Sequence, residues 1–205
     1  FSIEFAQHRP YTAGDDLRHL DWKVMARTDK LHLKQYQKET NLDLVILVDV
    51  SGSMWFRSDD APWHKYDLAA SVGASIAFLA QKQQDRASLT VFSDRLLAAT
   101  RLSNAHDHWR TIAALLASQD LSETPVEENA PHTDLARLFD QVLAKLTRRS
   151  LVVLVSDLFD STDNIERGLA RVFHRRHDLM ILQPLDPAER DLPFHSPSQF
   201  IGMET

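Results

Sequence analysis

Three oxygen-bearing side chains stand at alternate positions in the stretch Asp49-Val-Ser51-Gly-Ser53. One carboxylate and two hydroxyls form a hard ligand set that contains only oxygen and carries little charge. Such a set suits Mg2+ or Mn2+ far better than zinc, which prefers nitrogen and sulfur ligands. The spacing therefore predicts a site for a divalent cation. A simpler interpretation is a turn after a strand, in which Asp49 accepts hydrogen bonds from backbone amides.

Two further oxygen-bearing residues belong to the same prediction. Thr133 lies directly before a predicted helix, and Asp157 follows a short apolar run. In an open α/β sheet, ligands bind in the crevice at the carboxyl ends of the strands, where both residues would lie beside Asp49. An octahedral ion held there would still keep waters or accept an outside ligand. This favours a metal site over a turn, with the ligands Asp49, Ser51, Ser53, Thr133 and Asp157.

Strands and helices must position these ligands, and the apolar pattern predicts both. Residues 44–48 form an uninterrupted apolar run, typical of a strand buried on both faces. Further strands are predicted at residues 87–92, 96–102, 151–155 and 178–182. Helices are predicted at residues 65–84, 109–116, 134–146 and 163–174. This alternation indicates an α/β fold: a doubly wound, mostly parallel central sheet with helices on both faces and 96–102 as an antiparallel edge strand.

Two local patterns refine this scheme. The apolar spacing of the helix at 65–84 predicts four side chains on its buried face, namely Leu68, Val72, Ile76 and Leu79. The proline-rich tail after Pro184 predicts one short strand near Phe200.

Residues 1–40 differ from the rest because charged and aromatic residues are dense there. Gly14 followed by two aspartates predicts a turn and a helix N-cap, with a short helix from Leu17 to Arg27. Residues 31–38 alternate apolar and polar, as a half-exposed strand does. We expect residues 1–40 to form an ordered arm packed on the main domain, residues 41–205, with Tyr11 and Trp22 as its packing anchors.

The composition excludes several classes of function. The chain has 205 residues, 43% hydrophobic and 25% charged, which is ordinary for a globular α/β domain with a small attachment. A net charge of -6 argues against a nucleic-acid-binding surface. The pairs Arg148-Arg149 and Arg175-Arg176 are too short for such a surface and are typical of helix ends.

The chain has no cysteine, which excludes disulfides, thiolate zinc sites and cysteine nucleophiles. This agrees with a reducing compartment, so we expect a cytoplasmic protein. No apolar stretch approaches the roughly 20 residues that cross a bilayer, so no membrane segment is expected within this chain. Because the chain begins with Phe1, we expect it to be a piece of a longer protein.

Enzymatic functions have weaker support. The chain contains neither a P-loop nor a Gly-x-Ser-x-Gly nucleophile motif. A haloacid-dehalogenase-like phosphatase would need a second carboxylate where Ser51 stands. A metal-dependent hydrolase acting on phosphate esters stays as the alternative, since Mg2+ can polarise a phosphoryl oxygen. It would need a general base beside the metal, and because no residue fits that role we expect no catalytic activity.

Two sets of motifs resemble known families. Asp49-x-Ser51-x-Ser53, with Thr133 and Asp157, resembles the metal-ion-dependent adhesion site of von Willebrand factor type A domains. The arm motif Arg9-x-Tyr11-x-x-Gly14-Asp-Asp-x-Arg18 and the later Leu185-Asp-Pro-x-Glu189 are similar to the bacterial family called domain of unknown function fifty-eight. The resemblance covers nearly the whole chain. It departs at His132, where glycine is usual.

The resemblance implies a von Willebrand type A fold in which Asp49, Ser51 and Ser53 bind the ion directly. Thr133 and Asp157 would bind it directly or through water. It also implies a protein partner that donates a carboxylate to the ion, and a MoxR-type AAA+ ATPase as co-worker. We therefore expect a protein-interaction module dependent on Mg2+, Mn2+ or Ca2+, serving as an adaptor in protein complex assembly or maturation.

Overall fold

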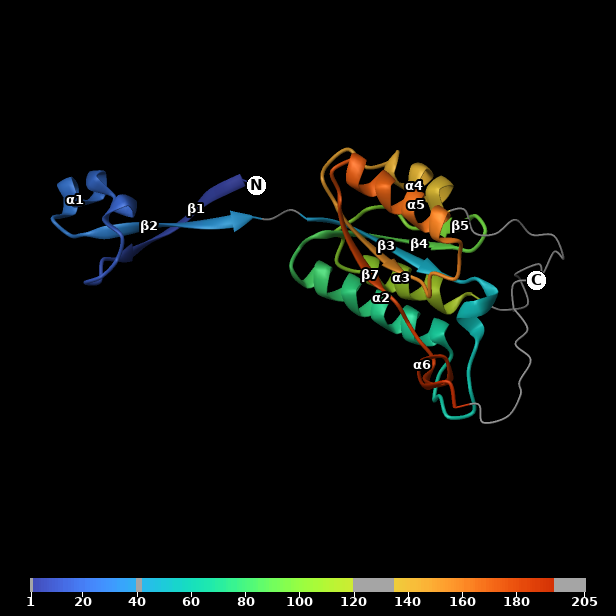
Figure 1. Cartoon of the computed structure of the whole chain (residues 1–205). Coiled ribbons are helices and arrows are strands. Elements are labelled where there is room, and N and C mark those ends of the chain that lie inside the picture. Colours follow the sequence, from blue (N-terminus) through green and yellow to red (C-terminus); the bar gives the residue numbers. More distant parts are fainter. Residues whose placement is uncertain (1, 40–41, 120–134, 194–205) are drawn as a thin grey trace. The chain divides into compact units, whose positions relative to one another are not determined.

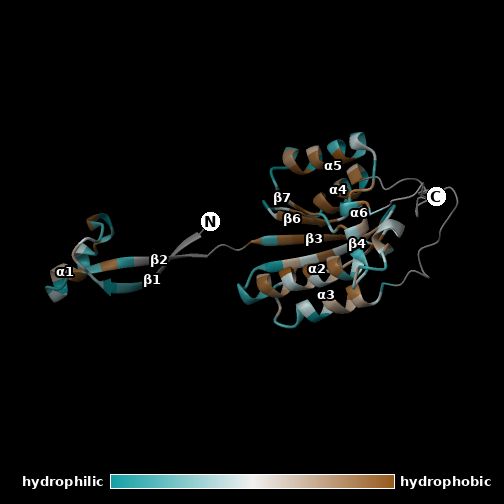
Figure 2. Ribbon diagram, turned by 60° about the horizontal axis from the view of Figure 1, so that its bottom comes forward, coloured by the Kyte–Doolittle hydropathy of each residue, from teal (hydrophilic) through white to brown (hydrophobic). Residues whose placement is uncertain are grey.

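In the computed structural model, which describes residues 2–39, 42–119 and 135–193, the apolar run forms β3 (Asp43–Asp49), and every residue of this strand is buried. Figure 2 shows most of β3 in the hydrophobic colour. β4 (Arg86–Phe92) and β6 (Leu151–Val155) pair with β3 in parallel on either side. A central parallel strand is covered on both faces, which is why leucine, isoleucine and valine side chains follow one another without a polar break.

Five strands make this sheet, in the order β5-β4-β3-β6-β7. β7 (Asp178–Leu182) is parallel to β6, whereas β5 (Leu96–Ala99) is antiparallel to β4 and lies at the edge. The predicted fold class, a mostly parallel sheet with one antiparallel edge strand, is confirmed.

Helices cover both faces of the sheet (Figure 1). The first pair, α2 (Lys65–Lys82) and α3 (His108–Ala117), packs in a core cluster with Ile46 and Val48. The second pair, α4 (Leu135–Leu143) and α5 (Thr162–His174), packs in another with Val45 and Leu47. Successive β3 side chains therefore serve opposite helix layers, as the period-two geometry of a strand requires.

The buried face of α2 was predicted only in part. Leu68 and Leu79 are 39% and 58% exposed, whereas the sheet-facing residues are small: Ala69, Gly73, Ala77 and Ala80. A Cβ on Gly73 would lie 3.3 Å from the Val48 side chain. The helix approaches the strands so closely that only small side chains fit between them, so Leu68 and Leu79 turn outward, while Ile76 packs partly buried against the same core.

The chain after β7 contains α6 (Pro187–Asp191), a short helix that the apolar pattern does not predict. Asp186 and Glu189 form a capping box at its start, and Pro187 occupies its first turn. The strand predicted near Phe200 lies outside the described residues. No helix among the described residues is long and apolar enough to cross a membrane.

The chain divides into two compact units, Phe1–Asn41 and Leu42–Thr205. The first contains an antiparallel pair, β1 (Ser2–Pro10) and β2 (His32–Glu39), of which only β2 was predicted. Packing of this arm on the second unit stays a prediction. Within the arm, Trp22 is 64% exposed.

The single helix predicted from Leu17 to Arg27 is two helices, η1 (Leu17–His19) and α1 (Trp22–Thr28). The break comes at Leu20, which is buried and bridges to Leu33 of β2. Asp16 caps η1 as predicted, and Asp21 caps α1 by accepting hydrogen bonds from the amides of Lys23 and Val24. Because Asp21 is itself an N-cap, a new helix begins after it and the segment forms two helices.

Asp21 also makes the arm sensitive to acid. Its hydrogen bond with His8, at 2.9 Å, together with the two capping amides and Lys34 lowers the pKa of this carboxyl to about 2. Because that pKa lies below the ordinary 3.8, the stabilisation is fully present above about pH 4 and is lost as the pH falls through 2. We expect Asp21→Ala to speed hydrogen exchange of the α1 amides at neutral pH. Asp16→Ala is the matched control and should affect only η1; equal effects on α1 would contradict this role.

Candidate metal site

The candidate site lies where β3 ends, at the carboxyl edge of the parallel strands. Asp49 is the last residue of β3 and is 4% exposed. Ser51 is the N-cap of the short helix η2 (Gly52–Trp55), which carries Ser53 inward. The Asp49 Oδ1 accepts a 2.8 Å hydrogen bond from the Ser51 amide, and the two serine Oγ atoms lie 3.3 Å apart. The structure therefore brings Asp49, Ser51 and Ser53 together.

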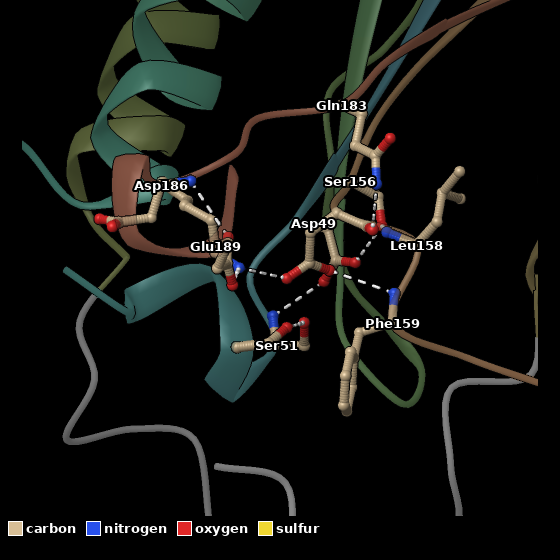
Figure 3. A network of polar contacts seen from close by, with 11 residues as sticks. Asp49, Ser51, Ser156, Leu158, Phe159, Gln183, Asp186 and Glu189 are labelled. Atoms are coloured by element: carbon tan, nitrogen blue, oxygen red, sulfur yellow. Dashed lines mark hydrogen bonds and ion pairs between the residues drawn. The ribbon is translucent and has the colours of Figure 1, made fainter. Parts of the chain in front are cut away.

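Ser156 completes the surroundings of the Asp49 carboxylate (Figure 3). Its hydroxyl donates a 2.6 Å hydrogen bond to the Asp49 Oδ2. Val48 and Val155 are register partners, so Ser156 follows β6 at the level where Asp49 ends β3. The sequence contains that signal, because parallel neighbours bring residues at the same distance along each strand together. Ser156 was nevertheless given no role there.

Asp49 forms no ion pair with a cationic side chain of the described residues, and the pKa of its carboxyl is raised accordingly. Burial, with the nearby Asp157 charge adding to it, raises the pKa of the Asp49 carboxyl to about 6, although its hydrogen bonds with Ser156 and Ser51 oppose the shift. An ionised carboxylate in this position lacks a compensating positive charge. A bound cation would supply one.

Asp157 lies beside Asp49 as predicted but is bound to a lysine. The Lys65 Nζ donates to the Asp157 Oδ2 at 2.8 Å, and both side chains are about 95% buried. The other oxygen, Oδ1, accepts a 3.3 Å hydrogen bond from the amide of Phe159, whose ring is 66% exposed. Both Asp157 oxygens therefore have partners within the protein. Thr133, the fifth predicted ligand, lies outside the described residues.

Lys65 ties the site to the end of the chain. Its Nζ also donates to the Glu189 Oε1 of α6 at 2.6 Å. Burial lowers the pKa of Lys65, but the bonds to Asp157 and Glu189 outweigh this and raise it, so the ammonium keeps its charge. Lys65 lies in the first turn of α2, where a positive charge is unfavourable because it opposes the helix dipole. A lysine at such a position indicates a carboxylate partner elsewhere, so the sequence contained a signal for this ion pair.

A second contact fastens α6 to the loop that follows the serines. The Asp186 Oδ2 accepts a 3.0 Å hydrogen bond from the Ser58 amide, and Oδ1 accepts from the amide of Ala188. Asp186 is 3% exposed, and Figure 3 shows it with Glu189 on the segment beside Asp49. The Leu185-Asp-Pro-x-Glu189 motif thus attaches α6 to the site by two contacts, from Asp186 to Ser58 and from Glu189 to Lys65.

The residues present fit a hard divalent ion. The oxygen donors converge at the end of a buried strand, and the 3.3 Å between the serine Oγ atoms compares with about 3 Å between adjacent ligands of an octahedral Mg2+. The described parts of the chain contain no cluster of three or more histidine, aspartate or glutamate residues that could hold a metal ion.

Comparison with known proteins agrees with this architecture. A family model described as "Protein of unknown function DUF58" matches residues 7–205. Uncharacterized protein Mb1516 of Mycobacterium bovis and uncharacterized protein Rv1480 of Mycobacterium tuberculosis are each 30% identical over 190 residues. That alignment covers 93% of this chain but only 57% of each relative, so the chain spans little more than half of their length.

Solved structures with low identity share the fold. The conserved hypothetical protein BatB from Bacteroides thetaiotaomicron superposes with a TM-score of 0.54 at 13% identity, covering 69% of this chain and 66% of that one. An aerotolerance-related membrane protein from Bacteroides fragilis gives 0.56 at 12% identity, covering 69% and 67%. The second unit therefore has a von Willebrand type A-like fold.

Proposed function

Since this chain belongs to the family of proteins of unknown function DUF58, we propose that it is a divalent-cation-dependent protein-interaction module that works as an adaptor for a MoxR-type AAA+ ATPase. The observation that carries the proposal is the buried Asp49 carboxylate, which has two serine hydroxyls beside it and no cation of the described residues paired with it. Asp49, Ser51 and Ser53 would hold the ion. A bound Mg2+ or Mn2+ would supply an open coordination position for an aspartate or glutamate of the partner.

The other residues have supporting roles in this proposal. Ser156 orients the Asp49 carboxylate through its 2.6 Å hydrogen bond. Asp157, whose oxygens already bind Lys65 and the Phe159 amide, would contribute its charge or a water-mediated contact. The exposed Phe159 ring, two residues after Asp157, offers an apolar surface against which a residue flanking the partner's carboxylate would pack.

The test is a binding measurement with a purified MoxR-type ATPase from the same organism. We expect association in Mg2+ that is lost with a chelator. A Ser51→Ala/Ser53→Ala variant should bind the partner roughly 10- to 100-fold more weakly, because two of the proposed hydroxyl ligands of the ion are removed. Ser71→Ala/Ser75→Ala is the matched control, since both hydroxyls lie exposed on α2 and bond only to backbone carbonyls. Partner binding that is indifferent to the chelator would contradict the proposal.

The same variants separate this function from the hydrolase. A metal-dependent phosphate-ester hydrolase would turn over p-nitrophenyl phosphate, and turnover would vanish in Ser51→Ala/Ser53→Ala. The site argues against this alternative, because Asp157, the nearest carboxylate that could act as a base, is held by Lys65. Turnover that follows the two serines would replace the interaction module with an enzyme.

A further inference from the structure

Two arginine pairs that lie far apart in the chain meet at the amino ends of neighbouring strands. Arg148 and Arg149 precede β6, and Arg175 and Arg176 precede β7. The turns are held side by side because Leu151 and Asp178 are register partners and the Asp178 amide donates to the Ser150 carbonyl at 3.0 Å. Parallel pairing thus converts two separate dipeptides into one basic cluster.

The cluster lines a surface cleft of about 1140 Å³. Four arginines and one aspartate are the charged residues among the ten that line it, so its formal charge is +4 − 1 = +3 with histidine neutral. The whole chain carries -6. The ring of Phe173, 66% exposed, forms an apolar part of the wall.

The protein uses only one of these arginines for its own fold. Arg149 makes a two-pronged ion pair with Asp178, with N···O distances of 3.0 and 2.6 Å. Arg148, Arg175 and Arg176 pair with no carboxylate among the residues that the structure describes. Arg171 already places a cation in the last turn of α5, where it offsets the helix dipole. The remaining guanidinium groups are free to bind carboxylates.

We propose that this cleft binds an acidic segment of a protein partner. Within the cleft, Arg149 binds Asp178 in a bidentate ion pair. A glutamate or aspartate of the partner would make the same kind of contact with the neighbouring arginines. The exposed Phe173 ring suits an apolar residue in the same segment. A nucleic acid fits less well, because it needs a broad basic surface and the chain as a whole is acidic.

The cleft is separate from the candidate metal site. Asp49 is the last residue of β3 and Asp157 lies just beyond the carboxyl end of β6, whereas Arg149 precedes the amino end of β6. The five residues of β6 separate the two sites by roughly 15 to 20 Å along the sheet. One chain could therefore hold two acidic partners, or two parts of one, at opposite edges of its sheet.

The experiment measures fluorescence anisotropy of a labelled oligoglutamate peptide with the whole chain, in chelator so that the metal site takes no part. We expect binding that weakens with added salt and falls about tenfold or more in Arg148→Glu/Arg175→Glu, since two attractive ion pairs are lost and the reversed charges repel the peptide. Arg101→Glu/Arg110→Glu makes the same charge change on exposed residues outside the cleft and should alter binding less than about twofold.

Three results would overturn the proposal. No binding of oligoglutamate, equal loss in both double variants, or tighter binding of oligothymidylate than of oligoglutamate would each exclude a cleft specific for acidic protein. If Arg148→Glu/Arg175→Glu fails to fold by circular dichroism, Arg148→Gln/Arg175→Gln replaces it, with an expected loss of about threefold or more and the same criteria.

Discussion

Asp49→Asn is expected to stabilise the metal-free protein while abolishing its response to divalent cations. The pKa of Asp49 is raised from its ordinary 3.8 to about 6 by burial, so the ionised carboxylate opposes folding. This cost is absent below about pH 4, grows between pH 4 and 6, and is complete above pH 6. At pH 7.5 the amide should therefore raise the free energy of unfolding by about 3 kcal/mol, and near pH 4 by almost nothing.

Added Mg2+ should stabilise the wild type but not Asp49→Asn, and so should remove most of the stability advantage of the variant. A ligand present at about 100 times its Kd stabilises the protein that binds it by about 2.7 kcal/mol, so Mg2+ should recover for the wild type most of what ionised Asp49 costs. Asp49→Asn should gain nothing, because an amide is a poor ligand for a hard cation. Urea denaturation of both proteins, with chelator and with Mg2+, at pH 7.5 and near pH 4, measures the free energy of unfolding in each of the four conditions.

The control for this experiment is Asp60→Asn, which removes the same charge from an exposed loop position. It should leave the free energy of unfolding within about 0.5 kcal/mol of the wild type in every condition. An Asp49→Asn protein that Mg2+ stabilises as much as the wild type would remove Asp49 from the proposed ligands.

Lys65→Met is expected to be among the most destabilising single substitutions in the second unit. It leaves the buried Asp157 carboxylate without its 2.8 Å partner and removes the Lys65–Glu189 bond, one of the two contacts that fasten α6. Removal of one member of a buried ion pair typically costs about 3 to 5 kcal/mol, because the remaining charge is uncompensated. We expect a loss of that size in the free energy of unfolding measured by urea denaturation.

Two further variants show whether burial is the cause. Arg149→Met breaks the exposed pair with Asp178 and should lower the free energy of unfolding far less than Lys65→Met does, because water screens an exposed ion pair. Lys65→Met/Asp157→Asn should recover part of the loss, since the uncompensated charge is gone. A Lys65→Met protein within about 1 kcal/mol of the wild type would mean that Lys65 does not hold Asp157 in place.

The sequence by itself determined the fold class, because that class follows from local and periodic patterns. The uninterrupted apolar runs at β3 and β6 predict strands covered on both faces, and the helical segments between them require parallel pairing. The juxtaposition of Asp49 with the two serines and Asp157 also followed, since parallel strands end at one edge of the sheet. What failed was finer detail: α2 turns alanines rather than leucines toward the sheet, because the packing distance decides which face is buried.

Only the tertiary structure decided what surrounds Asp49 and Asp157. Lys65 lies 92 residues from Asp157 and 124 from Glu189, and no periodic pattern links positions so far apart. The arginines before β6 and β7 likewise read as ordinary helix ends until strand pairing brings them into one cleft. Periodicity records which face of an element is apolar, whereas side-chain partners depend on which elements become neighbours. For the Asp49-x-Ser51-x-Ser53 stretch, the sequence supplied the oxygen donors. The fold buried the Asp49 carboxylate, paired it with no cation of the described residues, and paired the neighbouring Asp157 with Lys65.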